Sequence, residues 1–190
     1  MNIFDFYSPI YDWFMKFWRL YKPEAIIRAL EPKKKEIILD IGGGTGYIAN
    51  QISKKCKKVI VLDSSAKMLR QAKKYKNPKL ILCNASALSV PYKKGYFDAV
   101  VFTGALHHIN NSDLSLKEAY RVLKKNGKIV ILEFSKKSFI GKILYLFEII
   151  YVEAIKFFRP EELRKKCLKA GFQGEIKKIS RGEYLFIGKK

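Results

Sequence analysis

Residues 37–49 narrow the choice of fold more than any other segment of this 190-residue chain. An apolar, β-prone run at 37–39 ends in the carboxylate Asp40, and a helical pattern begins near Tyr47. Between them lies a glycine turn made of Gly42, Gly43, Gly44 and Gly46. Glycine accepts positive φ and leaves no Cβ in the way of a ligand, while the helix start presents free backbone N–H groups. The pattern predicts a strand–loop–helix unit that holds a small molecule. A plain tight turn is the alternative.

The rest of the chain continues the alternation of strands and helices. We predict strands at 37–41, 58–62, 79–83, 97–102 and 128–134, and helices at 23–30, 46–55, 64–72 and 112–126. The expected N-caps are Ser64 or Ser65 for the third of these helices, and Ser112 or Asp113 for the fourth. Such alternation indicates a parallel sheet with right-handed crossovers.

The C-terminal part departs from this alternation. A helix is expected to begin at Pro160 and end near Gly171, followed by two strands at 175–179 and 183–188 that form a hairpin. The predicted fold class is therefore α/β: a Rossmann-like, doubly wound sheet, mostly parallel, with an antiparallel C-terminal hairpin and helices on both faces.

We expect a single domain, 1–190, with four parts. Residues 1–33 form a helical lid rich in aromatic side chains, and residues 36–134 form the ligand-binding core. Residues 138–158 form an apolar helical insertion, and 160–190 form the C-terminal helix and hairpin. Four ionisable groups within 138–158 argue against a bilayer span and favour an amphipathic helix. For both aromatic segments, ordinary packing on the core is the alternative.

The net charge and the cysteine content limit which binding partners and which cellular compartment we expect for this protein. The net charge of +21, carried mostly by lysine, favours attraction to RNA or to an anionic membrane surface; a general lysine bias is the alternative. The three cysteines are widely spaced, and the only histidines are the adjacent His107 and His108. No zinc site or disulfide framework is therefore predicted. Because the N-terminus has no signal-peptide pattern, we expect a cytoplasmic protein with membrane association as a further option.

A second carboxylate, Asp63, lies at the end of the second predicted strand, 23 residues after Asp40. In nucleotide-binding α/β folds, a carboxylate at this position accepts hydrogen bonds from the two ribose hydroxyls. A solvated strand-end aspartate is the alternative. Together with the glycine loop, Asp63 favours a ribose-containing ligand.

Five segments carry a family resemblance, and they occur in order. They are 39–46 (LDIGGGTG), 61–69 (VLDSSAKML), 84–92 (NASALSVPY), 96–101 (YFDAVV) with 105–109 (ALHHI), and 118–127 (EAYRVLKKNG). As a set they resemble the class I S-adenosylmethionine-dependent methyltransferases. Within that family, 8–12 (SPIYD) and 132–136 (LEFSK) are most similar to the ubiquinone/menaquinone-biosynthesis type. Asn84 departs from the family pattern, because an aspartate is usual there.

The resemblance implies S-adenosylmethionine as cofactor, S-adenosylhomocysteine as product, and no metal. It assigns the methionine end to Asp40 and the glycine loop, and the ribose to the segment with Asp63, Ser64 and Met68. Further implied contacts are Asn84 and Ala85 beside the adenine, Thr103 and Gly104 near the sulfonium, and Tyr11 closing the pocket. His107 or His108 is a candidate base, and shaping of the loop is the alternative role.

The implied function is methyl transfer to a small, apolar or lipid-like acceptor, quinone-like or phospholipid-like. An RNA or protein methyltransferase is an alternative, favoured by the charge. Residues 103–106 (TGAL), however, lack the Asn/Asp-Pro-Pro-aromatic tetrad of base-amine methyltransferases. A non-catalytic cofactor-binding module or a dinucleotide enzyme is a third reading, since Gly44, Gly46 and Ala49 fit a loose dinucleotide pattern.

Overall fold

The structure is a computed structural model that describes residues 22–135, 157–180 and 182–190. The predicted lid segment 1–21, with Tyr11, lies outside the described residues. So does most of the predicted apolar insertion, of which only Phe157 and Phe158 are described. None of the helices in the described ranges has the length and apolar character needed to cross a bilayer.

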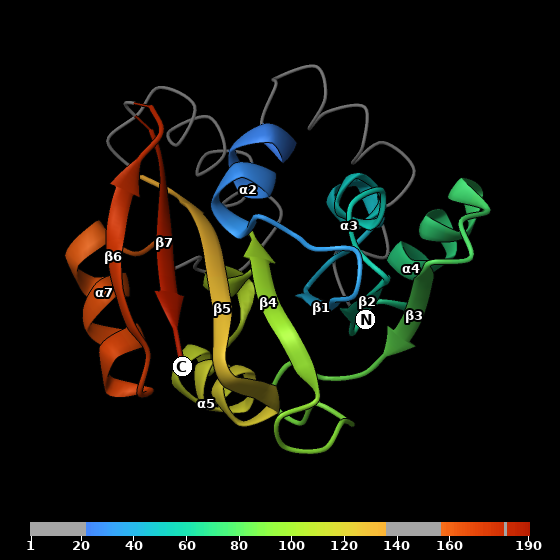
Figure 1. Cartoon of the computed structure of the whole chain (residues 1–190). Helices are drawn as coiled ribbons and strands as arrows, with labels where there is room; N and C mark the ends of the chain where they lie inside the picture. Colours follow the sequence, from blue (N-terminus) through green and yellow to red (C-terminus); the bar gives the residue numbers. More distant parts are fainter. Residues whose placement is uncertain (1–21, 136–156, 181) are drawn as a thin grey trace.

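Seven strands form one sheet in the order β3-β2-β1-β4-β5-β7-β6 (Figure 1). The strands are β1 Ile37–Ile41, β2 Lys58–Asp63, β3 Leu80–Asn84, β4 Phe97–Thr103, β5 Leu123–Phe134, β6 Gln173–Lys178 and β7 Glu183–Lys189. The first five run parallel, whereas β7 pairs antiparallel with both β5 and β6. The predicted α/β class with an antiparallel C-terminal hairpin is confirmed.

Helices cover both faces of the sheet. On one face, α2 Pro23–Leu30, α3 Tyr47–Ser53 and α4 Ala66–Ala72 pack against inward residues of the strands, such as Val59 and Val101. On the other face, α5 Ser112–Val122 and α7 Pro160–Lys169 pack against Leu39 and Val100. Buried strands that alternate their side chains between two apolar layers explain the near-continuous hydrophobic runs in the sequence. Two short 3₁₀ helices, η1 Lys73–Tyr75 and η2 Leu106–His108, complete the described elements.

The α5 helix differs from its prediction at both ends. Its N-cap is Asn111, whose side chain accepts a hydrogen bond from the Leu114 N–H, and neither Ser112 nor Asp113 takes that place. The helix ends at Val122, and β5 begins at once. The Asn-Gly signal at 126–127 is instead a bulge inside β5, where Asn126 has a φ of 62° and donates its N–H to the Lys190 carbonyl. The distant C-terminus supplies the partner that the local pattern did not reveal.

The site follows from where the parallel strands end. The strand order reverses between β1 and β4, which is the switch point at which open α/β sheets bind ligands. The carboxyl ends of β1, β2 and β4 bring Asp40, Asp63 and Thr103 to this one edge.

Candidate functional site

The glycine loop after β1 is packed too tightly for side chains. Gly42 has a φ of +69°, and a Cβ there would lie 2.5 Å from the Cβ of Ala105. A Cβ on Gly43 would lie 2.8 Å from Asp40 Oδ2. The Gly42 N–H donates to the Leu62 carbonyl at 2.8 Å, which ties the loop to the end of β2. The loop therefore brings bare backbone to the pocket edge, as the sequence predicted.

Asp40 is a buried carboxylate without a hydrogen bond. It is 0% exposed, and neither of its oxygens has a hydrogen-bond partner among the described residues. Burial, with a smaller contribution from nearby Asp63, raises the pKa of Asp40 to about 7. Because a buried charge is costly without compensation, this carboxylate fits a ligand that brings positive charge or N–H donors.

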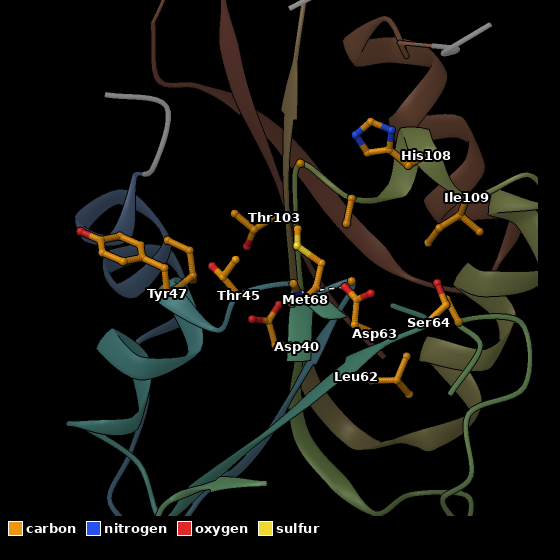
Figure 2. A pocket seen from close by; sticks show the side chains of 17 residues that line it. Asp40, Thr45, Tyr47, Leu62, Asp63, Ser64, Met68, Thr103, His108 and Ile109 are labelled. Carbon is orange, nitrogen blue, oxygen red and sulfur yellow. Dashed lines mark hydrogen bonds between the residues drawn. The ribbon is translucent and has the colours of Figure 1, made fainter. Parts of the chain in front are cut away.

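Asp63 is held in one orientation by backbone donors. Its Oδ2 accepts the Gly44 N–H at 2.9 Å, and its Oδ1 accepts the Ser65 N–H at 2.8 Å. A carboxylate oxygen can accept more than one hydrogen bond, and the Asp63 side chain lies on the pocket lining (Figure 2). An oriented acceptor-only group at the end of β2 suits a pair of ligand hydroxyls.

The pocket combines predicted residues with others that the sequence did not single out. Of the predicted site residues, it is lined by Asp40, Gly42, Gly43, Gly44, Asp63, Ser64, Met68, Thr103, Gly104 and His108. Thr45, Tyr47, Ile48, Leu62, Ala87, Ala105 and Ile109 line it as well. Most of these additional residues are apolar neighbours of predicted ones, so adjacency to the motifs was the only signal that could have found them.

Four predicted residues are not among the lining residues of this pocket. Gly46 is the N-cap of α3, with a φ of 72°. Asn84 donates its side-chain N–H groups to the carbonyls of Asp63 and Ser64, at 2.9 and 3.0 Å. The Ala85 N–H donates to the Asp63 carbonyl at 3.2 Å. Asn84 and Ala85 therefore brace the strand end that carries Asp63.

His107 is the fourth predicted residue that does not line the pocket, and its side chain contacts Glu133 instead. Its Nδ1 lies 2.5 Å from Oε2 of Glu133, and its ring stacks on Phe157 with a centroid separation of 4.8 Å. Glu133 is 0% exposed, and its Oε1 has no hydrogen-bond partner among the described residues. Sequence reasoning placed Glu133 in a family-like segment but gave it no role.

His108 lies on the pocket wall (Figure 2). Its ring centroid is 4.1 Å from that of His107. Burial, and then the proximity of His107, lowers the pKa of His108 well below its ordinary value. The ring is therefore neutral at pH 7. At the end of β4, the buried Thr103 Oγ1 has no hydrogen-bond partner in the described part of the chain.

The amino-acid sequence matches those of known methyltransferases. Residues 39–131 match a family model described as a methyltransferase domain. The ubiquinone/menaquinone biosynthesis C-methyltransferase of Agrobacterium fabrum is 38% identical over 128 residues, which cover 62% of this chain and 49% of that protein. The Rickettsia typhi protein of the same name is 38% identical over 143 residues, which cover 68% of this chain and 56% of that protein. The chain spans about half the length of the curated relatives it matches.

A solved structure extends the likeness to the whole fold. A methyltransferase of Thermotoga maritima, described as dependent on S-adenosylmethionine, superposes with a TM-score of 0.79 at 23% identity. The superposition covers 99% of this chain and 98% of the Thermotoga chain. At this identity the likeness concerns the fold.

Proposed function

Because this chain carries a class I S-adenosylmethionine-dependent methyltransferase domain, we propose that it transfers a methyl group from S-adenosylmethionine to a small, apolar acceptor. The observation that carries the proposal is Asp40, a fully buried carboxylate with no hydrogen-bond partner among the described residues. The methionine end of S-adenosylmethionine supplies an ammonium group and a sulfonium, which are the positive charges and donors that such a carboxylate lacks.

The other lining residues fit the remainder of the cofactor. Asp63 would accept the two ribose hydroxyls, with Ser64 and Met68 beside them. Asn84 and Ala85 would act on the adenine side by bracing Asp63. Thr103 and Gly104 would lie near the sulfonium, and the predicted contact of Tyr11 stays a prediction. The bound cofactor supplies the electrophilic methyl group, so the protein contributes mainly position and electrostatics.

The names of the curated relatives support a quinone-like acceptor methylated at carbon. In such a transfer a carbon–carbon bond forms, the sulfur–methyl bond breaks, and the proton on the acceptor carbon must leave. His108 is the proposed proton acceptor, because it lines the pocket. Its lowered pKa keeps the ring neutral at pH 7, so a nitrogen can accept a proton, but the same shift makes the ring a weaker base. His107 is better placed to hold His108 from behind, since it contacts Glu133. A phospholipid-like acceptor remains the other apolar candidate.

The basic surface supports a contact with anionic membrane lipids. Residues 54–79 hold ten lysines and arginines and a single acidic residue, Asp63. They lie after the end of α3, at the start of β2, in α4 and η1, and in the turn before the edge strand β3. We propose a cytoplasmic enzyme that meets its acceptor at an anionic membrane surface. The same charge favours an RNA or protein methyltransferase as the second candidate function.

Binding of S-adenosylhomocysteine and of NAD, measured by calorimetry, tests the cofactor assignment. We expect S-adenosylhomocysteine to bind and NAD not to bind. The reverse result would overturn the proposal and favour a dinucleotide enzyme.

A methyl-transfer assay on a cell extract separated into lipid, RNA and soluble pools tests the acceptor. Labelling of a quinone in the lipid pool is the expected result. Labelled RNA with steeply salt-dependent RNA binding would favour the second candidate. Cofactor binding with no transfer to any pool would indicate a non-catalytic module.

The role of His108 is tested by His108→Gln. Loss of a general base lowers turnover by roughly 10²–10⁴-fold, and the affinity for S-adenosylhomocysteine should stay within about threefold because Asp40 and Asp63 are untouched. Turnover close to that of the unaltered enzyme would remove His108 from the mechanism.

A further inference from the structure

The loop between β3 and β4 forms one wall of the pocket through Ala87. Its first end is fixed at the ribose side, where Asn84 and Ala85 donate hydrogen bonds to the carbonyls of Asp63 and Ser64. Around Ala87 the loop closes on itself, because the Ser89 N–H donates to the Ser86 carbonyl at 3.2 Å. Ala87 therefore lies between two ends of a compact turn, and its position depends on both.

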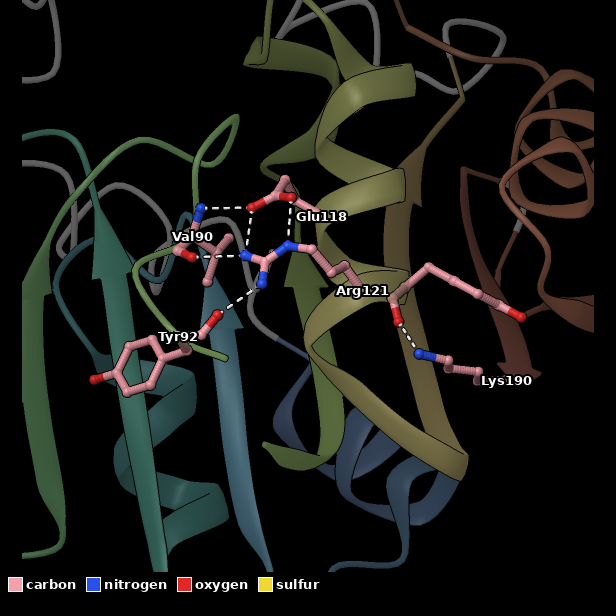
Figure 3. Close-up of polar contacts among 6 residues, drawn as sticks. Val90, Tyr92, Glu118, Arg121 and Lys190 are labelled. Carbon is pink, nitrogen blue, oxygen red and sulfur yellow. Dashed lines mark hydrogen bonds and ion pairs between the residues drawn. The ribbon is translucent and has the colours of Figure 1, made fainter. Parts of the chain in front are cut away.

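The second end of the loop is held from α5 by Glu118 and Arg121 (Figure 3). The Val90 N–H donates to Glu118 Oε2 at 2.8 Å. Arg121 donates from Nη2 to the Val90 carbonyl and from Nη1 to the Tyr92 carbonyl, both at 2.8 Å. We call these contacts the Glu118–Arg121 clamp. Val90 is 3% exposed, so the clamp also satisfies backbone groups where the chain enters the core.

The two clamp residues also bind each other. Arg121 Nε and Nη2 each donate to one oxygen of Glu118, at 2.7 Å. The Arg121 hydrogen bonds lower the pKa of Glu118, which keeps the carboxylate charged and able to accept from Val90. Only the planar guanidinium can serve a carboxylate and two carbonyls in one fixed geometry; lysine has a single nitrogen that cannot reach all of them together.

The position of α5 gives the clamp a wider effect. The residues before α5, His108 and Ile109, also line the pocket, and Asn111 caps the helix. The clamp lies toward the other end of the same helix. One helix thus holds the loop of Ala87 at its C-terminal part and follows directly on pocket-lining residues at its N-terminal end.

We propose that Glu118 and Arg121 are positioning residues for the cofactor: they set the adenine-side wall through Val90 and Tyr92 without touching the ligand themselves. The proposal rests on the proposed function, because it takes the ligand of this pocket to be S-adenosylmethionine. Losing the clamp lowers affinity for adenine-containing ligands and leaves the binding-competent fraction of the protein unchanged.

Calorimetric titration with S-adenosylhomocysteine and with 5′-methylthioadenosine tests this on Arg121→Met, Arg121→Lys and Glu118→Gln. We expect Arg121→Met to raise both dissociation constants by roughly tenfold, with unchanged stoichiometry. Arg121→Lys should recover part of the loss, because one carbonyl contact can survive. A defect in folding alone would instead lower the stoichiometry at an unchanged dissociation constant.

Lys124→Met is the matched control. Lys124 pairs with Asp98 at 2.5 Å and is half-exposed, as Arg121 is, but none of its hydrogen bonds reaches residues 85–92. The dissociation constants of Lys124→Met for both ligands should stay within about twofold of those of the unaltered protein. Equal affinities for Arg121→Met and Lys124→Met would overturn the positioning role, as would lower stoichiometry alone. If the unaltered protein binds neither ligand, the proposed function itself fails, and the two failures are thereby distinguished.

Discussion

Asp40 and Asp63 end neighbouring parallel strands, yet their surroundings are opposite. Asp40 is fully buried, has no hydrogen-bond partner among the described residues, and has its pKa raised to about 7. Asp63 is only partly buried and accepts backbone N–H groups from Gly44 and Ser65. The described residues therefore satisfy one carboxylate with backbone donors and leave the other without a hydrogen bond, which is why we propose Asp40 as a ligand contact.

The difference suggests that the carboxylates at the carboxyl ends of β1 and β2 suit different parts of a ligand. A carboxylate held by backbone donors is oriented before the ligand arrives, which suits recognition of a ribose edge by shape. A buried carboxylate without donors gains most from a cation, because the ligand offsets a desolvation cost already present in the protein. The following predictions change one member of this comparison at a time.

The largest effect is expected for Asp40→Asn, on the pH dependence of the free energy of unfolding measured in the absence of ligand. Because the folded pKa of Asp40 is raised to about 7 from 3.8, the folded state holds a proton that the unfolded state releases. The free energy of unfolding should therefore fall as pH rises from about 4 to about 7, by up to about 4 kcal/mol from this group. Asparagine cannot titrate, so the variant should lack this part of the pH dependence.

Urea unfolding at several pH values measures this effect, and saturating S-adenosylmethionine should reverse it for the unaltered protein. Identical pH dependence of the two proteins would show that Asp40 does not titrate between folded and unfolded states. Asp98→Asn is a useful control, since Asp98 has protein donors, the Ile37 N–H and Lys124.

Asp63→Ala is expected to have the next largest effect. It removes the proposed ribose acceptor and also releases the N–H groups of Gly44 and Ser65. Affinity for S-adenosylhomocysteine should fall by about 1–3 kcal/mol, as measured by calorimetry. Asp63→Asn keeps one acceptor oxygen and should lose less. Unchanged affinity in Asp63→Ala would count against the ribose assignment.

Ser65→Ala should have the smallest effect and separates the side chain from the backbone at the same residue. The Ser65 hydroxyl caps α4 by accepting the Met68 N–H at 3.1 Å, whereas the Ser65 N–H holds Asp63. Thermal unfolding should show a loss of about 1 kcal/mol from the missing cap. Affinity for S-adenosylhomocysteine should be retained; a loss as large as that of Asp63→Ala would mean that the cap also orients the carboxylate.

Most of the fold could be predicted from the chain's local patterns. The number and order of the strands, the Ser65 alternative for the α4 cap and the α2 boundaries agree with the structure, because they depend on hydrophobic periodicity and turn residues close in sequence. The β5 strand is the exception, since it begins at Leu123 and not at the predicted residue 128. The family, the fold class and S-adenosylmethionine are confirmed by the matches to known methyltransferases. The division into lid, core, insertion and C-terminal part stays a prediction.

The end of α5 and the roles of two site residues could not be predicted in this way. Asn126 belongs to a strand because the chain terminus, 64 positions away, accepts its N–H. Asn84 braces the Asp63 backbone, which is brought beside it by parallel pairing of β2 and β3. Such contacts depend on strand register, and local propensity carries no information about it.

The amino-acid sequence alone determined which strand ends carry the proposed cofactor contacts. Asp40, the glycine loop and Asp63 lie at strand ends, where the order of strand, loop and helix already decides which edge they share. Only the tertiary structure decided that His108 lines the pocket while His107 contacts Glu133, and that Glu118 and Arg121 hold the loop of Ala87. These pairings join residues 26 to 31 positions apart on different elements. Packing, rather than spacing along the chain, brings them together.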